Sequence, residues 1–340
     1  MAFIALKMRK NILIVGLALT IFPNLCCFSG NKQVFSESKL IMGTVVQMTV
    51  ATRTEQEARS AMQEAFAEIE RADGLLSSYR EGSLIAKLNR EGHDHKVPFE
   101  KDIFDLMDEA ATMSEASGGA FDLTIWPVAS LWRFDKGGVL PDKGSLEDAV
   151  AKVGYRNLHL DKKNRSVGFH RRGMGVDLGA IAKGWAVDRA MARLAARGIV
   201  HAIIDAGGDL RIAGSRPGKG FWRIGVQHPR EPGVLLLTFD LTDTAIVTSG
   251  DYERFFIEGG VRYHHILDPV TGMPATGCQS VTVLAATAAE ADAAATAAFV
   301  LGPERGISFL RSRPGVRGLI VDADGALHWT DGDLEKMARR

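Results

Sequence analysis

Residues 39–51, KLIMGTVVQMTVA, and the segment 55–75 after them decide the fold class. The first segment alternates apolar and polar side chains and is rich in β-branched residues, which predicts a strand or the first half of a hairpin. Met42-Gly43-Thr44 interrupts the alternation, and a glycine there either lets another group approach the backbone closely or marks a bulge. The second segment has apolar residues at helical spacing and predicts an amphipathic helix.

The rest of the chain continues this mixture of strands and helices without regular βαβ repeats. Helical spacing or capping predicts further helices after Ser83 and over residues 101–117, 141–152, 180–197 and 288–301. Strand patterns cover residues 158–169, 201–213, 221–227, 235–241, 245–257 with a break at 249–250, 278–285 and 318–321. We therefore expect an α+β fold of antiparallel-rich mixed sheets with helices packed on their faces. No strong linker interrupts residues 36–335, which predicts a single catalytic domain of two interlocked lobes.

Residues 1–30 differ in character from the remainder of the chain. A positive start, Lys7 to Lys10, precedes an apolar run at 12–22 that is short for a membrane span. This pattern predicts an export signal and a periplasmic protein; an uncleaved anchor is the alternative. Cys26 or Cys27 offers a site for a lipid that would tether the protein to the inner membrane, although the residues before them lack the small side chains of a lipoprotein cleavage box. Cys278 is the only cysteine beyond this leader, so no internal disulfide is expected.

Composition excludes one class of partner. The chain has 340 residues, is 46% hydrophobic and 24% charged, and carries a formal net charge of zero. That length and apolar content suffice for a substantial core. A neutral chain has no basic field with which to hold a polyphosphate strand, so a nucleic acid partner is not expected.

Residues 264–277, HHILDPVTGMPATG, form a polar, turn-rich stretch deep in the second half of the chain. Asp268-Pro269 and Thr271-Gly272 are turn signals, because proline fixes φ and glycine tolerates positive φ. An imidazole here can act as a base or an acid near neutral pH. A surface turn with a solvated histidine pair explains the same residues.

Two further stretches have the composition of a binding site. In residues 288–301, AAEADAAATAAFVL, Asp292 and Thr296 lie one helical turn apart on one face, where they can ligate a hard cation such as Mg²⁺. A solvated Asp292 and a Thr296 bonded to its own helix backbone are the alternative. Residues 174–188, MGVDLGAIAKGWAVD, run into a helix whose N-terminus suits a phosphate, or whose preceding carbonyls face a cation. That pattern matches neither a Walker loop nor GxGxxG.

Eight motifs in order resemble the FAD:protein FMN transferase family, known as ApbE. They cover nearly all of the chain after the leader, which makes the resemblance specific although each motif alone is weak. The motifs are MGT at 42–44, LSSYREGSLIAKLN at 76–89, GGAFD at 118–122, VDLGAIAKGWAVD at 176–188, DAGGDLRIAG at 205–214, SGDYERFF at 249–256, HHILDPVTGMP at 264–274 and ADAAATAAFVLG at 291–302.

The resemblance implies roles for particular residues. FAD is the substrate, and Met42 and Tyr79 would hold its flavin ring. The remaining contacts to FAD would come from Ala120, Phe121, Asp122, Asp177, Lys183 and Ile266. Mg²⁺ would take the backbone carbonyl of Ala180 and the side chains of Asp292 and Thr296.

The same resemblance implies the reaction. The family transfers the FMN half of FAD through a phosphodiester to a threonine or serine of a target protein, with release of AMP. His265 would be the proton-transfer residue, and Asp268 would either orient its ring or lie in the outer shell of the metal. Acceptors of this family resemble Asp-Gly-x-Ser/Thr-Gly-Ala-Thr, and no such run occurs here. We therefore expect the flavin to go to another protein, such as a subunit of a membrane redox pump.

Two other functions fit the same residues. A FAD pyrophosphatase would use water in place of the acceptor hydroxyl and produce FMN and AMP. A non-enzymatic lipoprotein would bind FAD and deliver it intact.

Overall fold

The computed structural model describes residues 32–134 and 138–339. The predicted leader, residues 1–30, lies outside the described residues, so export and lipidation stay predictions. Within the described ranges no helix is long and apolar enough to cross a membrane. Residues Lys32–Arg340 cluster as one compact unit.

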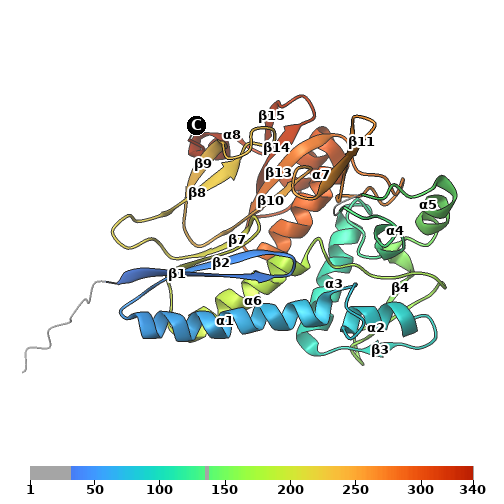
Figure 1. Cartoon of the computed structure of the whole chain (residues 1–340), viewed down its shortest axis with the longest axis horizontal. Helices are drawn as coiled ribbons and strands as arrows, with labels where there is room; N and C mark the ends of the chain where they lie inside the picture. The colour runs from blue at the N-terminus through green and yellow to red at the C-terminus, as the bar shows by residue number, and fades with distance from the viewer. Residues whose placement is uncertain (1–31, 135–137, 340) are drawn as a thin grey trace, which may run out of the picture. The chain divides into compact units, whose positions relative to one another are not determined.

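An eight-stranded antiparallel sheet is the central element of the fold, in the order β1-β2-β6-β7-β10-β13-β14-β15 (Figure 1). The neighbours β1-β2, β6-β7 and β14-β15 pair as hairpins, whereas β13 and β14 are joined through α7 and β2 and β6 through more than half of the helices. The predicted α+β class with helices on the faces of antiparallel sheets is confirmed. The strands are β1 (Gln33–Ile41), β2 (Thr44–Thr52), β6 (Ala202–Ala206), β7 (Asp209–Ala213), β10 (Ala245–Gly250), β13 (Cys278–Ala285), β14 (Arg317–Asp322) and β15 (Leu327–Trp329).

The two faces of this sheet pack against different layers, because successive side chains of a strand point to opposite faces. In β10, Ala245 and Val247 join the core formed with the helices, whereas Ile246 joins a second core on the other face. The helical layer consists of α1 (Glu55–Leu76), α6 (Ala182–Ala196) and α7 (Ala288–Arg311). The opposite layer consists of the hairpin β8 (Trp222–Gln227)–β9 (Leu235–Leu241) and α8 (Gly332–Met337).

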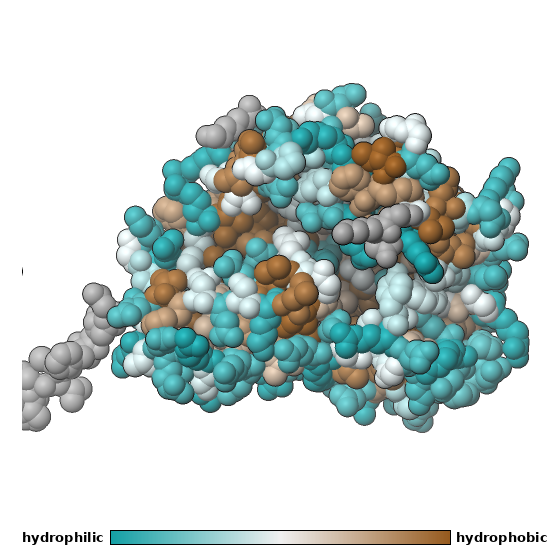
Figure 2. Space-filling view, viewed as in Figure 1, coloured by the Kyte–Doolittle hydropathy of each residue, from teal (hydrophilic) through white to brown (hydrophobic). Residues whose placement is uncertain are grey.

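Helix α1 shows how sequence pattern becomes packing. The hydroxyl of Thr54 accepts a hydrogen bond from the N–H of Glu57 and caps the helix start. Its apolar stripe is fully buried against α6 and the sheet, and truncating Phe66 in that stripe to alanine should cost about 3–5 kcal/mol. The lower edge of the molecule in Figure 2, where α1 lies, is predominantly hydrophilic, as the amphipathic pattern requires.

Smaller elements surround one end of the sheet. They comprise the helices α2 to α5, the 3₁₀ turn η1, the three-stranded sheet β3-β5-β4 and the separate hairpin β11-β12. Their bounds are α2 (Leu84–Glu91), β3 (Val97–Pro98), α3 (Lys101–Ala116), α4 (Trp126–Ala129), α5 (Lys143–Val150), the 3₁₀ turn η1 (Tyr155–Asn157), β4 (Leu158–Asp161), β5 (Ser166–Phe169), β11 (Phe255–Glu258) and β12 (Val261–His264). Ser83 and Asp142 cap α2 and α5, as their positions in the sequence predict.

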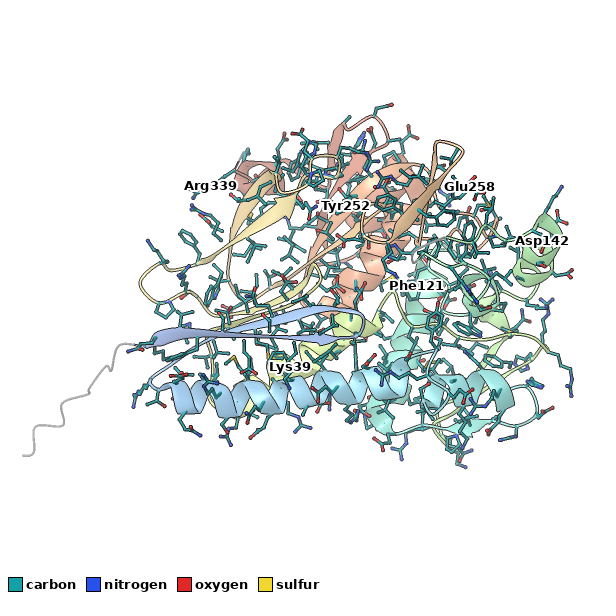
Figure 3. All side chains as sticks on the ribbon, in the orientation of Figure 1. Lys39, Phe121, Asp142, Tyr252, Glu258 and Arg339 are labelled. Atoms are coloured by element: carbon teal, nitrogen blue, oxygen red, sulfur yellow. The ribbon has the colours of Figure 1, made fainter. Side chains whose placement is uncertain are left out.

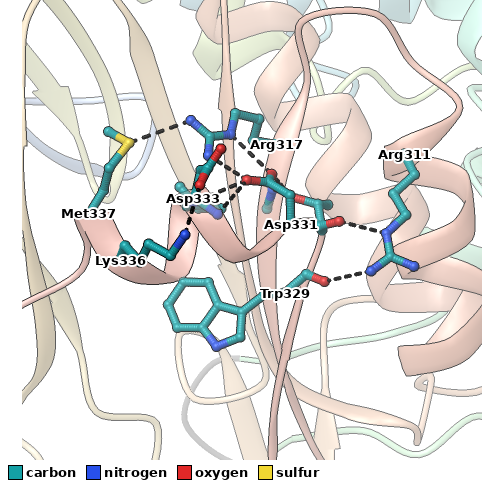
Figure 4. A network of polar contacts seen from close by, with 10 residues as sticks. Arg311, Arg317, Trp329, Asp331, Asp333, Lys336 and Met337 are labelled. Carbon is teal, nitrogen blue, oxygen red and sulfur yellow. Dashed lines mark hydrogen bonds and ion pairs between the residues drawn. The ribbon is translucent and has the colours of Figure 1, made fainter.

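A polar network fastens the C-terminal helix to the sheet (Figure 4). Arg317 makes two hydrogen bonds to Asp331, of 2.6 and 3.1 Å, and this guanidinium holds the pKa of Asp331 far below its usual range. The same carboxylate caps α8 through the N–H groups of Asp333 and Leu334. One aspartate therefore joins β14 to α8 and closes the second core.

The interpretation of Met42-Gly43 as a bulge is wrong, whereas close approach of another group to the backbone of Gly43 stays a prediction. These two residues are the turn of the β1–β2 hairpin, with φ of 54° and 72°, and Ile41 pairs with Thr44 across it. Two consecutive positive φ angles give the tight turn whose twist matches a hairpin. The hairpin begins at Gln33, six residues before the predicted strand start at 39.

Three other boundaries also differ from the prediction. Strand β10 runs through the expected break at 249–250, and β11 begins at Phe255. Helix α7 continues past residue 301 to Arg311, with a kink at Gly302 before Pro303. Strand β12 was not expected from the sequence, because its four residues are half exposed and do not alternate clearly.

Candidate functional site

The N-terminal parts of α6 and α7 lie against each other and form the base of the site. A Cβ at Gly184 would meet the carbonyl oxygen of Ala288 at 2.2 Å, so only glycine allows this approach. The carboxylate of Asp188 accepts the N–H groups of Ala288 and Ala289, at 3.0 and 2.9 Å, and holds the start of α7 in place. Both helix starts are therefore fixed relative to each other.

Two buried carboxylates share one ammonium group at this junction. Lys183 on α6 hydrogen-bonds to Asp209 at the start of β7, and its Nζ lies 3.8 Å from Oδ2 of Asp292 on α7. Both aspartates are at most 3% exposed. Burial and the neighbouring Asp209 raise the pKa of Asp292 to about 7, and burial also raises the pKa of Asp209. Although burial opposes it, the two carboxylates raise the pKa of Lys183.

The surroundings of Asp292 offer further oxygen ligands. The N–H of Gly184, which in a regular helix would bond to the carbonyl of Ala180, donates instead to Asp292 Oδ2 at 3.2 Å. Thr296 lies one turn after Asp292, with its hydroxyl 3.5 Å from that of Ser249. These are hard oxygen donors of the kind that Mg²⁺ takes. The described residues contain no group of three or more His, Cys, Asp or Glu side chains placed to hold a metal. The predicted magnesium ligands are one carboxylate, one hydroxyl and one backbone carbonyl, so that finding does not test them. The magnesium site stays a prediction.

His265 lies at the open end of the β11–β12 hairpin. Its ring is half-buried, and its Nδ1 is buried without a hydrogen-bond partner in the described part of the chain. Burial, with the charges of Arg254, His264 and Lys183, lowers the pKa of His265 to about 3. The ring is therefore neutral at pH 7, and a negative charge beside it would strengthen it as a base. Lys183, which pairs with the two buried carboxylates, is one of the charges that lower this pKa.

The alternative of a solvated histidine pair is wrong for His264. This residue is 4% exposed, and its Nε2 lies 2.8 Å from the carbonyl oxygen of Ala275. Burial lowers its pKa. The two adjacent histidines thus differ, because alternation along the chain turns one into the core and the other toward the site.

Asp268 organises the loop after the hairpin. Its Oδ1 accepts the N–H of Val270 at 2.9 Å, and its backbone bonds to Met273 and Gly272 close a tight turn. Trp132 Nε1 donates to the carbonyl of Gly272 at 3.0 Å and ties this loop to the aromatic segment after α4. No hydrogen bond joins Asp268 to His265 among the described residues. A catalytic role of Asp268 stays a prediction.

The expected flavin-binding residues divide into an exposed and a buried group. Tyr79 is 67% exposed, and Trp126 meets it edge to face with ring centroids 5.0 Å apart. Burial raises the pKa of Asp177, whose Oδ1 accepts the N–H of Gly179 at 2.7 Å. Met42 is half-buried in the hairpin turn. The exposed Tyr79 with the half-buried Trp126, beside a carboxylate, provides a flat apolar platform with one polar edge.

The remaining expected contacts are largely internal. Phe121, labelled in Figure 3, is 3% exposed, and Ile266 is 5% exposed. Asp122 accepts hydrogen bonds from Thr124 and from the N–H of Tyr155 at 3.0 Å, so its carboxylate already has partners that fix the loop. The contacts to FAD expected of these side chains and of Ala120 stay predictions.

Four residues near the site had no role assigned from the sequence. They are Asp209, Glu253, Arg254 and Trp126. Asp209 stands in a Gly-Gly-Asp turn in which the glycines, rather than the carboxylate, carry the local signal. Glu253 and Arg254 belong to the motif SGDYERFF, and only the tertiary structure shows that the charges of Lys183 and Asp209 act on Glu253.

Comparison with known proteins gives the family. The family model described as the ApbE family matches residues 42–320. The chain belongs to the ApbE family. This confirms the resemblance found in the sequence and the expectation of an enzyme.

Relatives of the ApbE chain agree in name and in fold. A FAD:protein FMN transferase of Treponema pallidum is 35% identical over 322 residues, covering 89% of this chain and 88% of the relative. A FAD:protein FMN transferase of Klebsiella pneumoniae is 32% identical, covering 86% and 90%. The crystal structure of the ApbE protein of Thermotoga maritima matches with a TM-score of 0.83 at 34% identity, covering 91% of this chain and all of that one.

Proposed function

We propose that this protein is a Mg²⁺-dependent FAD:protein FMN transferase, which attaches FMN from FAD to a threonine or serine of a target protein through a phosphodiester and releases AMP. Its relatives carry that name. The single observation that carries the proposal is the pair Asp209 and Asp292, which share the one ammonium of Lys183 in a buried junction. Two carboxylates with one ammonium leave a net negative charge in low dielectric, which favours a bound cation.

The residues at the junction fit a magnesium ion. Asp292, Thr296 and the carbonyl of Ala180 would hold it, since all three supply oxygen and Asp292 lies farther from the ammonium of Lys183 than Asp209 does. When bound, the ion supplies neutralisation of the oxygens of the diphosphate. Lys183 adds a fixed positive charge beside the same place.

His265 has the properties of the proton acceptor. A threonine hydroxyl is a poor nucleophile until a base takes its proton. The neutral imidazole accepts that proton, the hydroxyl oxygen forms its bond to the phosphorus of the FMN half, and the bond to the bridging oxygen breaks. AMP leaves with that oxygen and its electron pair. Negative phosphate oxygens nearby raise the pKa of the imidazole above its value in the free protein and strengthen it as a base.

The flavin ring is held at the exposed end of the site. Tyr79 and Trp126 offer the stacking surface, and Met42 lies in the hairpin turn at the sheet edge. The leader pattern supports a periplasmic location and an exported acceptor, such as a subunit of a membrane redox pump. The acceptor hydroxyl belongs to a separate protein.

Incubation with FAD and an acceptor domain carrying Asp-Gly-x-Thr-Gly-Ala-Thr tests the proposal. Mass spectrometry should show one FMN added to the acceptor threonine with Mg²⁺, and none with a chelator. An acceptor with that threonine replaced by valine is the matched control. Rapid AMP release without acceptor would instead indicate a FAD pyrophosphatase. Intact FAD after long incubation with metal and acceptor would indicate a flavin carrier.

A further inference from the structure

Arg254 lies directly opposite His265 in the β11–β12 hairpin. Phe255 pairs with His264, and the N–H of His265 donates to the carbonyl of Arg254 at 3.1 Å, so the ladder continues by one residue. Residues directly opposite in an antiparallel pair place their side chains on the same face, with Cβ atoms about 4.5–5.5 Å apart. Glu258, labelled in Figure 3, lies at the other end of β11.

The guanidinium of Arg254 has no ion pair within the ranges that the structure describes, and the residue is exposed. Most other arginines around the central sheet and its helices bond to carboxylates, as Arg230 does with Asp251 and Arg317 with Asp331. Its positive charge acts on Asp177 as well as on His265. Its charge therefore acts on a residue beside the flavin platform, and its backbone contact places it next to the proton acceptor.

We propose that Arg254 binds the phosphoryl oxygens of the FMN half of FAD and stabilises their charge during transfer. This inference rests on the proposed function. A base that takes the acceptor proton lies about 3 Å from the attacking oxygen, so the phosphoryl oxygens come within reach of the residue paired with that base. Arginine suits this position, since its planar fork makes two parallel hydrogen bonds to phosphate and its charge persists at any working pH.

Arg254 and Lys183 would have different roles toward the diphosphate. Lys183 is committed to two buried carboxylates, whereas Arg254 is exposed and lies on the hairpin that carries the base. The junction of α6 and α7 and the open end of the hairpin would thus hold the diphosphate from two sides. His265, the proton acceptor, and Arg254, the charge stabiliser, are neighbours across the hairpin, so both side chains can reach the same phosphoryl group.

Substitutions Arg254→Gln and Arg254→Lys test the role. We expect kcat for transfer to fall about 100-fold in R254Q and about tenfold in R254K, as for loss of one donor to a developing charge. Arg305→Gln, on exposed α7 surface, removes the same charge and should transfer FMN at the native rate. The pKa of His265 seen in the pH–rate profile should rise in R254Q, since Arg254, His264 and Lys183 are the charged and titratable groups that depress it.

A binding measurement keeps the inference testable without transfer. Dissociation constants for FAD and for riboflavin, measured by flavin fluorescence, distinguish phosphate contact from general damage. We expect R254Q to weaken FAD binding about tenfold and to leave riboflavin unchanged. Equal losses for both ligands, or no loss for either, would overturn the role of Arg254. Failure of the native protein to flavinylate any acceptor would instead overturn the proposed function, with the FAD and riboflavin comparison still deciding on Arg254.

Discussion

Helix α6 supplies the positive charge for two buried carboxylate sites that differ in balance. Near its C-terminal end, Arg189 and Arg193 both contact Glu68 of α1, at 3.5 and 3.0 Å. At its start, Lys183 alone serves Asp209 and Asp292. At the first site Glu68 has two cations, one of which, Arg189, also lies 3.5 Å from Asp102, whereas at the second site one cation serves two carboxylates.

This difference separates a structural site from a functional one. A buried carboxylate with cationic partners links two helices, and removing it would leave those cations unpaired. A buried pair with too few partners disfavours its own ionised state: burial, together with the neighbouring Asp209, raises the pKa of Asp292 to about 7. Such a site is retained when a ligand supplies the missing charge, and active sites often reduce stability in this way.

Asp292→Asn gives the largest expected effect. The substitution keeps the shape and removes one of the two like charges, so transfer should fall roughly 1,000-fold while flavin affinity changes little. Stability without metal should stay equal or rise by about 1 kcal/mol, because Lys183 and Asp209 then form a balanced pair. FMN incorporation and urea unfolding measure the two quantities. Glu258→Gln, which removes an exposed carboxylate, is the control, and near-native transfer by D292N would exclude Asp292 as a metal ligand.

Glu68→Gln should have the opposite pattern, with a loss of stability and little change in transfer. Loss of this carboxylate leaves Arg189 and Arg193 without their shared partner, at a cost of about 1–2 kcal/mol, limited because both guanidinium groups reach solvent. Urea unfolding reports this loss, and transfer per folded molecule should remain within about twofold of native. A large loss of activity at full stability would show that the two sites are not separate.

Tyr79→Ala removes an uncharged stacking contact and can be compared with the changes at the two charged sites. The ring is mostly exposed, so folding should be unaffected, and affinity for FAD should fall about tenfold through lost stacking. Fluorescence titration measures the affinity. Tyr79→Phe keeps the ring and should bind FAD as the native protein does. An unchanged dissociation constant in Y79A would remove Tyr79 from the flavin site.

The smallest expected effect concerns pH. His265 has its pKa lowered to about 3 in the folded protein, against about 6.5 when unfolded. Between these values the unfolded chain binds the extra proton, so this group makes the free energy of unfolding rise with pH across the window and fall as pH drops below about 6.5. Between pH 7 and pH 5 these two pKa values correspond to about 2 kcal/mol, and screening of the half-buried ring by solvent reduces the expected loss of native protein relative to His265→Gln to about 1 kcal/mol. Parallel stability curves for the two proteins would show that the imidazole is not shielded.

Local sequence predicted most helices and strands of this protein. The stripe of α1, the caps Ser83 and Asp142 and the strand β13 follow from spacing and side-chain chemistry alone. The predicted boundaries of strands and helices were less accurate where one residue type fits two local structures. Gly43 serves as well in a turn as in a bulge, and nothing local distinguishes them.

The candidate site was predictable only where a motif carried its residues together. Asp292 and Thr296 share a helix face by spacing, and His265 stands in a recognisable loop. Asp209 was missed because its partners are far away in sequence, and Arg254 was missed because the strand β12 that brings His265 opposite it was not predicted. Lys183 lies 26 residues before Asp209 and Asp292 lies 108 after Gly184, so their charges meet only when the sheet and helices pack.

The sequence by itself determined the family, the α+β class and the residue types available for chemistry, because periodicity and short motifs are properties of neighbouring residues. Tertiary structure alone decided which carboxylates share a cation, which of two adjacent histidines is buried, and which arginine lies opposite the base. Those outcomes depend on burial and on charges from separate elements, and both exist only after strands and helices have packed together.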